Sequence, residues 1–296
     1  MPELPEVERV RRTIEPAVVG ARISRAELIR ADFCCAARTG RASRATPADL
    51  LHGAVVQSVV RRGKQFALVA ADGRVLCFHL GMSGQVVHTT PGSRTLELSH
   101  VHARWELDRQ GKPGGTLHFR DPRRFGGLWA FPTVADLEQA RWSSLGPDAL
   151  QATGAHLAEV FKGSRRAVKA ALLDQTVLAG VGNIYADEAL FDARIHPMTP
   201  CRRLTIERLD RLAAAIRAVL SNAISAGGST LRDFVDAQGS RGSYQRDHKV
   251  YGRAGESCTR CGVPLQSRQV AQRTTVFCPR CQDRKSGAGL PPGSSG

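Results

Sequence analysis

Four cysteines near the end of the chain constrain its fold more than any other feature of the sequence. They form two short pairs, Cys258 with Cys261 and Cys278 with Cys281, and sixteen residues separate the pairs. Two pairs at this spacing supply the four thiolates of a tetrahedral zinc shell, which leaves no open position for catalysis. Two surface disulfides are the alternative, but a cytoplasmic redox poise disfavours them. The spacing therefore predicts one structural Zn²⁺ that clips two short strands into a hairpin. No organic cofactor is expected.

The sequence before residue 132 alternates short apolar runs with turn residues. An opening helix is expected over residues 5–15, because Pro5 suits a first helical position and Glu6 suits the positive end of the helix dipole. Short β-like runs follow between residues 21 and 131, and Asp72-Gly73 between two of them is a signal for a two-residue hairpin. This pattern predicts a β-sandwich preceded by a helix.

After residue 132 the apolar residues recur at helical spacing. Helices are expected over residues 165–179 and 183–193 and around 209–223, where Gly227-Gly228 would end the last of them. The chain is therefore expected to be an α+β multidomain protein. The expected domains are a β-sandwich over 1–131, a linker and helical domain over 132–249, a zinc finger over 250–285 and a disordered Gly/Pro/Ser-rich tail over 286–296.

The charge of the chain indicates an anionic partner. Its 42 Lys and Arg residues exceed its 27 Asp and Glu residues, which gives a formal net charge of +15. The excess is concentrated between Arg241 and Lys285, and nucleic acid is the polyanion that such a basic cluster favours. No apolar run approaches the ~20 residues of a membrane-spanning helix, and the first residues lack the pattern of a secretory signal. We therefore expect a cytoplasmic protein that binds nucleic acid and no membrane.

Proline at position 2 introduces a candidate nucleophile. Removal of Met1, which a small second residue permits, gives Pro2 a free secondary amine. An α-amine titrates at ~8 against ~10.4 for lysine, so more of it is free base at neutral pH. Such an amine can attack a carbon and form a Schiff base, and the neighbouring Glu3 can move protons. The alternative is that these residues only begin a proline-capped helix, and the N-terminal residues alone favour that alternative.

Five motifs occur in order along the chain and carry a family resemblance. They are MPELPEVE at residues 1–8, HLGMSG at 79–84, DPRRFG at 121–126, GVGNIYA at 180–186 and VYGR at 250–253. Together with the four-cysteine hairpin, they resemble the bacterial formamidopyrimidine-DNA glycosylases, which repair 8-oxoguanine, over residues 1 to about 282. The resemblance implies a monomer with an N-terminal β-sandwich, a helix–two-turn–helix domain and a C-terminal zinc hairpin.

The resemblance also implies a reaction and its catalytic residues. The family removes oxidised purines, 8-oxoguanine and formamidopyrimidines, from double-stranded DNA, and then cleaves the abasic site by β,δ-elimination. Pro2 matches the nucleophile that attacks the sugar C1′, and Glu3 matches the general acid/base. Lys64 matches a lysine that contacts phosphate and transfers protons, and Arg273 matches an arginine of the zinc hairpin that grips phosphates and assists the last elimination.

A glycosylase must take its target base out of the stack, and apolar wedges can then fill the gap and kink the DNA. Met82, Arg123 and Phe125 match the residues that do so in the family, and Arg123 would also bond the widowed cytosine. Core packing is the alternative for Met82 and Phe125, but the glycines around them favour loops. The other DNA contacts that the resemblance implies are Glu6, His100, Arg165, Lys169 and Asn183.

Two segments depart from the family pattern. Ser164 occupies a position where a DNA-binding lysine is expected, so Arg165 or Arg166 would substitute for it. The polar segment 236–248 matches the loop that closes over the flipped base, but its Arg241-Gly-Ser-Tyr244 differs from the family wording. This difference leaves the lesion preference open.

Three other functions compete with the purine glycosylase. An endonuclease VIII-like enzyme for oxidised pyrimidines would lack the sequence of residues 2–5 and the set of Met82, Arg123 and Phe125. A catalytically silent zinc DNA-binding module has no need of Pro2, Glu3 and Lys64. An uncleaved Met1 would favour this alternative, because the nitrogen of Pro2 would then be an amide and no nucleophile. A ribosomal or RNA-binding role explains the charge and the zinc but not the wedge residues. The expected location is the bacterial cytoplasm, in association with the nucleoid.

Overall fold

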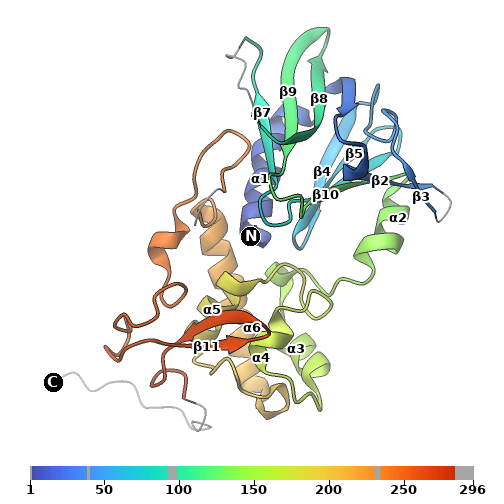
Figure 1. The fold of residues 1–296 in the computed structure, drawn as a ribbon. Helices are drawn as coiled ribbons and strands as arrows, with labels where there is room; N and C mark the ends of the chain where they lie inside the picture. The colour runs from blue at the N-terminus through green and yellow to red at the C-terminus, as the bar shows by residue number, and fades with distance from the viewer. Residues whose placement is uncertain (1, 39–40, 93–98, 231–233, 284–296) are drawn as a thin grey trace. The chain divides into compact units, whose positions relative to one another are not determined.

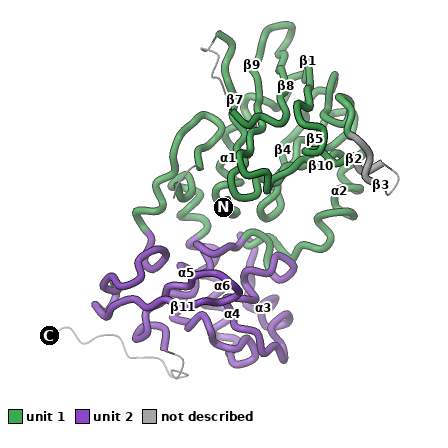
Figure 2. Tube along the Cα trace, in the orientation of Figure 1, with its two compact units in different colours: residues 1–149, 178–180, 220–247 green, residues 150–177, 181–219, 248–296 purple. Residues whose placement is uncertain are grey.

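The computed structural model describes residues 2–38, 41–92, 99–230 and 234–283 (Figure 1). The chain divides into two compact units (Figure 2). Unit 1 gathers residues 1–149, 178–180 and 220–247, and unit 2 gathers residues 150–177, 181–219 and 248–296. The tail expected over 286–296 lies outside the described residues.

Unit 1 contains two β-sheets. The four-stranded sheet has the order β1 (Arg22–Leu28), β8 (Val101–Arg109), β9 (Lys112–Arg120) and β7 (Gln85–Thr89). The six-stranded sheet has the order β3 (Arg41–Arg44), β2 (Cys34–Arg38), β10 (Gly127–Phe131), β6 (Val75–His79), β5 (Gln65–Ala70) and β4 (Val56–Arg62). Neighbouring strands are antiparallel except for the parallel pair β2–β10.

The two sheets pack face to face over a shared apolar core, as the sandwich prediction requires. Alternate residues of each strand face inward, so that Phe78 of β6 lies 5.6 Å from the ring of Trp105 and 5.9 Å from that of Phe119. Helix α1 (Leu4–Val18) adds Val7, Val10 and further apolar residues at helical spacing to the same core. Full burial of each such side chain contributes about 1.5–3 kcal/mol before entropy is subtracted.

Short elements complete unit 1. Helix α2 (Val134–Leu137) and the turn after it cover the other face of the six-stranded sheet, where Leu137 and Trp142 pack on Cys77 and Phe131. The hairpin expected at Asp72-Gly73 joins β5 to β6, but Ala70 donates to the Arg74 carbonyl and closes a three-residue loop.

Two sequence expectations need correction. Strands β2 and β3 were not expected, because Cys34–Arg38 lacks branched residues and β2 is specified by its pairing with the distant β10. The helix expected over 165–179 is reduced to α4 (Val168–Leu172). It ends there because the Asp174 carboxylate accepts bonds from the backbone and the hydroxyl of Thr176 and turns the chain.

Unit 2 combines helices with a small hairpin. Its helices are α3 (Gly154–Phe161), α4, α5 (Asn183–Asp192) and the first part of α6 (Ile206–Ser225), whose last turns belong to unit 1. The hairpin consists of β11 (Gln266–Val270) and β12 (Arg273–Phe277), and it shares a core with Phe191 and Val250. The helices expected over 183–193 and 209–223 are confirmed. Among the described residues no helix is both long and apolar enough to cross a membrane.

Candidate functional site

The four cysteines of unit 2 form a compact cluster. Their Sγ atoms all lie within 4.8 Å of one another, with 4.0 Å between Cys258 and Cys281 and 3.5 Å between Cys261 and Cys278. Zinc–sulfur bonds of about 2.3 Å in a tetrahedron place sulfurs about 3.8 Å apart, whereas a disulfide requires about 2.05 Å. The cluster therefore fits one Zn²⁺. Backbone N–H groups of Arg260 and Cys281 donate to Sγ atoms and favour the thiolate form.

The zinc cluster holds a hairpin that presents Arg273. Ala271 and Gln272 form the turn with φ values of 49° and 58°, and Val270 pairs with Arg273 across it. This left-handed turn suits the twist of a hairpin but is costly for residues other than glycine. Arg273 is exposed, while Thr275 to Phe277 on the same strand are buried. The hairpin is thus a short, anchored support for one cation.

In unit 1 the first residues of α1 are fixed by a glutamate. Glu3 and Glu6 are buried and form a reciprocal capping box, in which Glu6 Oε2 accepts the Glu3 N–H at 2.8 Å. Glu6 Oε1 accepts the N–H of Ser229 at 2.7 Å. Because each oxygen of Glu6 receives a backbone N–H, this carboxylate ties the residues after Pro2 to segment 228–229.

A second contact fixes the same end of α1. The N–H of Leu4 donates to the carbonyl of Gly180 at 3.1 Å, and Gly180 has a φ of 117°. A Cβ at position 180 would collide with the Leu4 side chain, so only glycine permits this approach. The beginning of the motif at 180–186 therefore lies against the N-terminal residues.

Lys64 lies on the turn between β4 and β5, and a hydrogen bond and ion pairs fix this turn in place. Asp148 accepts the Gly63 N–H at 3.0 Å and the guanidinium of Arg61 at 2.6 Å, and Arg61 also pairs with Glu8 at 2.9 Å. Residue Asp148 in turn bridges to Ala179, next to Gly180. The charge pattern of the sequence does not predict these ion pairs, because Glu8, Arg61 and Asp148 are distant along the chain.

The half-buried His79 lies close enough to Lys64 to be influenced by its charge. Desolvation lowers the pKa of this imidazole to about 4, and the positive charges of Arg141 and Lys64 act in the same direction. His79 is therefore neutral at pH 7 and adds no charge to the site.

Met82 and Phe125 are exposed on two neighbouring loops, with 43% and 60% of their surface accessible. Core packing is thereby excluded for both side chains. The loops touch, because a Cβ at Gly81 would collide with the backbone of Phe125. Arg123 is exposed on the same loop as Phe125. His100, also exposed, precedes β8 with a φ of 61°.

Unit 2 holds Asn183 and Lys169 in different environments. Asn183 is the first residue of α5, and its side-chain amide donates to the Thr274 carbonyl at 3.2 Å. Lys169 has no exposed surface, and its Nζ lies 2.7 Å from both Asp187 Oδ1 and Thr275 Oγ1. A side chain so enclosed has no surface from which to contact a phosphate. The expected DNA contact of Lys169 therefore does not match its position in this structure.

The residues around Ser164 distinguish the two candidate arginines. Arg166 donates to Asp174 at 3.0 Å and to the Ala170 carbonyl at 3.1 Å, so it closes the C-terminal end of α4. Arg165 is exposed, and its side chain makes no hydrogen bond to any described residue. Arg165 is thus the arginine available to a ligand.

Segment 236–248 is anchored at its first residue. Asp236 is buried, and its Oδ1 accepts the N–H groups of Gln238 and Ser240 at 3.0 and 2.9 Å. Its Oδ2 accepts the guanidinium of Arg9 from α1 at 2.8 Å. The beginning of this loop is therefore fixed to the helix that starts beside Pro2.

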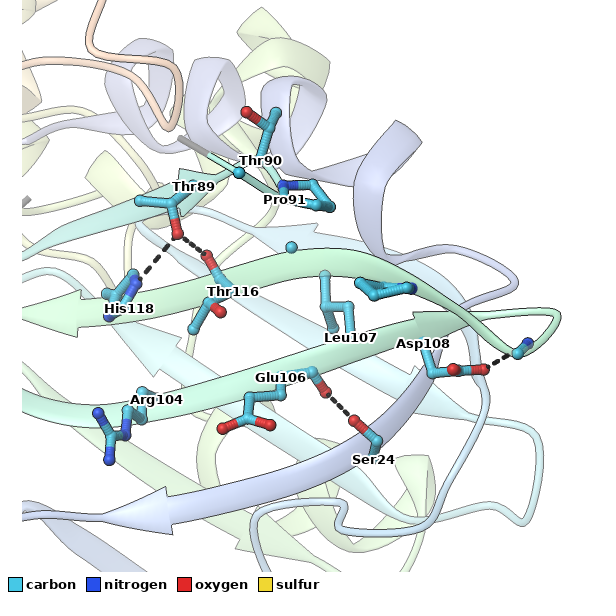
Figure 3. A pocket seen from close by; sticks show the side chains of 14 residues that line it. Ser24, Thr89, Thr90, Pro91, Arg104, Glu106, Leu107, Asp108, Thr116 and His118 are labelled. Atoms are coloured by element: carbon cyan, nitrogen blue, oxygen red, sulfur yellow. Dashed lines mark hydrogen bonds between the residues drawn. The ribbon is translucent and has the colours of Figure 1, made fainter. Parts of the chain in front are cut away.

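A pocket on the outer face of the four-stranded sheet contains none of the predicted site residues (Figure 3). Its polar groups bond mainly to one another: Thr89 donates to the Thr116 carbonyl, and Ser24 donates to the Glu106 carbonyl. Because these groups are already satisfied, the pocket offers no evident chemistry.

Comparisons with known proteins agree along the chain. Residues 1–128 match the formamidopyrimidine-DNA glycosylase N-terminal domain, residues 145–235 match the H2TH domain of that glycosylase, and residues 255–284 match a zinc finger found in FPG and IleRS. A formamidopyrimidine-DNA glycosylase of Paraburkholderia phymatum is 43% identical over 291 residues, which cover 95% of this chain and 100% of that protein. That of Symbiobacterium thermophilum is 41% identical and covers 99% and 92%.

Solved structures of the same kind are similar throughout. The MutM (FPG) protein from Thermus thermophilus is 40% identical, with a TM-score of 0.80 over 95% of this chain and 98% of that one. A mutant Lactococcus lactis FPG in complex with DNA containing Fapy-dG is 33% identical, with a TM-score of 0.82 over 95% and 100%. The Lactococcus lactis protein is also similar in complexes with abasic-site DNA and with DNA containing an oxidised pyrimidine.

Proposed function

Since this chain belongs to the formamidopyrimidine-DNA glycosylase family, whose members are DNA glycosylases with AP lyase activity, we propose that it excises oxidised purines from double-stranded DNA through the nitrogen of Pro2. The observation that carries the proposal is the anchoring of the N-terminus. Glu6 and Gly180 accept the backbone N–H groups of Glu3 and Leu4, the two residues after Pro2, so a free Pro2 amine would be held in place rather than on a mobile end. Preorganisation of this kind lowers the entropic cost of attack.

The proposed reaction begins after removal of Met1. The lone pair of Pro2 forms a bond to C1′ of the damaged nucleotide, and the electron pair of the glycosidic bond leaves with the base. The Pro2 nitrogen gives up its N–H proton, which balances the proton that the departing base takes up. Glu3 protonates the sugar ring oxygen as the ring opens, which gives a Schiff base between Pro2 and C1′. Loss of the C2′ proton then expels the 3′ phosphate, and a second elimination expels the 5′ phosphate. Lys64 and Arg273 are proposed to bind these phosphates and to move protons.

The wedge residues are proposed to stabilise the flipped state. Met82 and Phe125 would fill the space that the extruded base leaves, and Arg123 would donate to the widowed cytosine. The exposure of all three side chains on loops supports this assignment. His100, Arg165 and Asn183 are proposed phosphate contacts, and the N-terminal end of α5 favours an anion at Asn183.

Two residues take a modified role. Glu6 is proposed to position the N-terminus rather than to contact DNA directly, because both of its oxygens accept backbone N–H groups. Lys169 is proposed to support DNA binding indirectly, by fixing β12 through Thr275. The proposed division of labour keeps catalysis in 1–131, backbone binding in 132–249 and the Arg273 hairpin in 250–285. The protein is proposed to act as a monomer on the chromosome, in the cytoplasm at the nucleoid.

Borohydride trapping tests the reaction. A duplex with one 8-oxoguanine opposite cytosine should give a covalent protein–DNA band, and Pro2→Gly should reduce that band strongly. An undamaged duplex is the control for non-specific trapping. Trapping by Pro2→Gly at the wild-type level would move the chemistry to another amine, with Lys64 as the first to examine.

A thymine-glycol duplex tests the second candidate function. The complex of the similar Lactococcus lactis protein with an oxidised pyrimidine makes this comparison necessary. Faster trapping on 8-oxoguanine supports the purine preference, and faster trapping on thymine glycol overturns it. No trapping on either duplex, with DNA binding intact, would indicate a silent DNA-binding module or a retained Met1. Mass spectrometry of the N-terminus separates those two outcomes.

A further inference from the structure

One fully buried carboxylate connects the two loops that carry Met82 and Phe125. Asp121 is the first residue after β9 and has 0% of its surface exposed. Its Oδ1 accepts a short hydrogen bond of 2.5 Å from the hydroxyl of Ser83, which follows Met82 directly. A buried carboxylate requires several donors to offset its desolvation, and the remaining donors come from the second loop.

The Asp121 carboxylate also fixes the loop that follows it. Its Oδ2 accepts the N–H of Gly126 at 2.7 Å, and its Oδ1 accepts the N–H of Arg123 at 3.3 Å. The Ser83 hydroxyl accepts that same Arg123 N–H at 3.1 Å. Ser83, Asp121 and Arg123 thus form a closed triangle of hydrogen bonds across the two loops.

The backbone of Asp121 extends this network to His100. Its N–H donates to the His100 carbonyl at 3.0 Å, and its carbonyl lies 2.9 Å from Nε2 of His102. His100 and Arg124 both have left-handed φ values, 61° and 57°, which are unfavourable for residues with a side chain. Such conformations persist where the surrounding bonds over-determine them, and the bonds of Asp121 do so here.

We propose that Asp121 is a positioning residue that presents Met82, Arg123 and Phe125 to DNA as one rigid wedge, with Ser83 as the link between the two loops. The proposal rests on the proposed function of these side chains. Because the wedge side chains lie on two loops, both loops must insert them at the same base step at the same time. If the loops moved independently, each insertion would carry its own ordering cost, and the flipped state would be less populated.

Ser83→Ala tests the link without touching any wedge side chain. It removes the donor to Asp121 and the second acceptor of the Arg123 N–H. We expect excision of 8-oxoguanine opposite cytosine to slow by about 10- to 100-fold, the equivalent of one lost hydrogen bond to a charged group. Strand cleavage at a preformed abasic site should change by less than about threefold, because extrusion is easier where no base is paired. Discrimination between cytosine and adenine opposite the lesion should also decrease.

Two further variants separate positioning from general destabilisation. Ser83→Thr keeps the hydroxyl and should restore the wild-type excision rate. Ser24→Ala makes the same substitution on the outer face of the four-stranded sheet, where it removes an exposed hydrogen bond to the Glu106 carbonyl, and should leave both activities unchanged. Equal losses of glycosylase and lyase activity in Ser83→Ala, or no loss in either, would overturn the proposal.

A binding assay separates failure of the inference from failure of the proposed function. The fluorescence of 2-aminopurine beside the lesion rises when the step is unstacked, whether or not a bond to the protein forms. Wild-type protein should raise this fluorescence and Ser83→Ala should raise it less, at saturating protein. A wild-type rise without borohydride trapping refutes the Pro2 chemistry alone. Equal rises in the wild type and Ser83→Ala refute the coupled wedge alone.

Discussion

Replacement of Lys169 by Met tests whether this buried lysine is structural or binds DNA. The side chains of Lys169 and Asp187 have 0% and 1% of their surface exposed and lie 2.7 Å apart. Lys169 also donates to Thr275 Oγ1, and Asp187 Oδ2 accepts the N–H of Val276 at 3.0 Å. The pair therefore joins α4 and α5 to β12, the strand that begins with Arg273.

The expected cost follows from the loss of one partner of a buried pair. Removal of one side typically costs about 3–5 kcal/mol, because the other charge remains buried. Burial already raises the pKa of Asp187 to about 7, although the charge of Lys169 and the Val276 N–H act against that rise. Without Lys169 this carboxyl should take up a proton at neutral pH, which limits the cost. We therefore expect a loss of about 3 kcal/mol for Lys169→Met.

The assay is urea unfolding of the zinc-loaded full chain, followed in unit 2 by hydrogen exchange of peptides that cover α4, α5 and β12. The double variant Lys169→Met/Asp187→Asn retains an acceptor for Val276 and avoids the cost of protonating the buried carboxyl, so it should recover at least half of the lost stability. A direct phosphate contact predicts the opposite result. If Lys169 bound a phosphate, Lys169→Met would unfold like the wild type, and the salt dependence of its DNA affinity would decrease by about one phosphate contact. That pair of results would refute the structural role.

Three other expectations concern acid, zinc and histidine. Burial alone would raise the pKa of Glu8, but hydrogen bonds from Arg11 and Arg12 and the charge of Arg61 hold it below its ordinary value of 4.5. Its stabilisation is therefore complete above that value and is lost as the pH falls through the lowered pKa, so Glu8→Gln should make the acid unfolding of unit 1 less steep. Chelation of zinc should expose the amides of β11 and β12 to exchange and abolish DNA binding; full binding by metal-free protein would contradict this. His79→Gln should leave the pH–rate profile between pH 5 and 9 unchanged, because the pKa of His79 is about 4; a shifted limb would show that the imidazole titrates in that range.

Local patterns predicted the parts of the molecule that depend on local spacing. The four cysteines lie within 24 residues, and a thiolate cluster at that spacing has one common interpretation. The alternation that specifies the sandwich and the glycines beside Met82 and Phe125 are likewise visible in short windows. The family resemblance then supplied roles that no spacing could give.

Other features depend on distant partners that no short window of sequence contains. The resemblance assigns Lys169 to DNA, whereas in the structure its amine donates to Thr275, which lies 106 residues away. Asp121 was not singled out, since a carboxylate between a strand and two arginines gives no sign of being fully buried. β2 forms because β10 provides a parallel neighbour, and that pairing cannot be found from the composition of Cys34–Arg38.

Unit 1 is assembled from three separate stretches of the chain, and this has a consequence for how the enzyme is made. The anchors of α1 include Gly180 and Ser229, which a ribosome synthesises long after Ala149 has completed the sandwich. At about 5–20 residues per second, the stretch that ends at Asp247 follows Ala149 by about 5–20 s. During that interval the nascent sandwich lacks the contacts that hold its first residues. A stalled or prematurely terminated chain would therefore carry the proposed nucleophile without the contacts that hold it, and chromosomal DNA would meet an active enzyme only when synthesis is nearly complete.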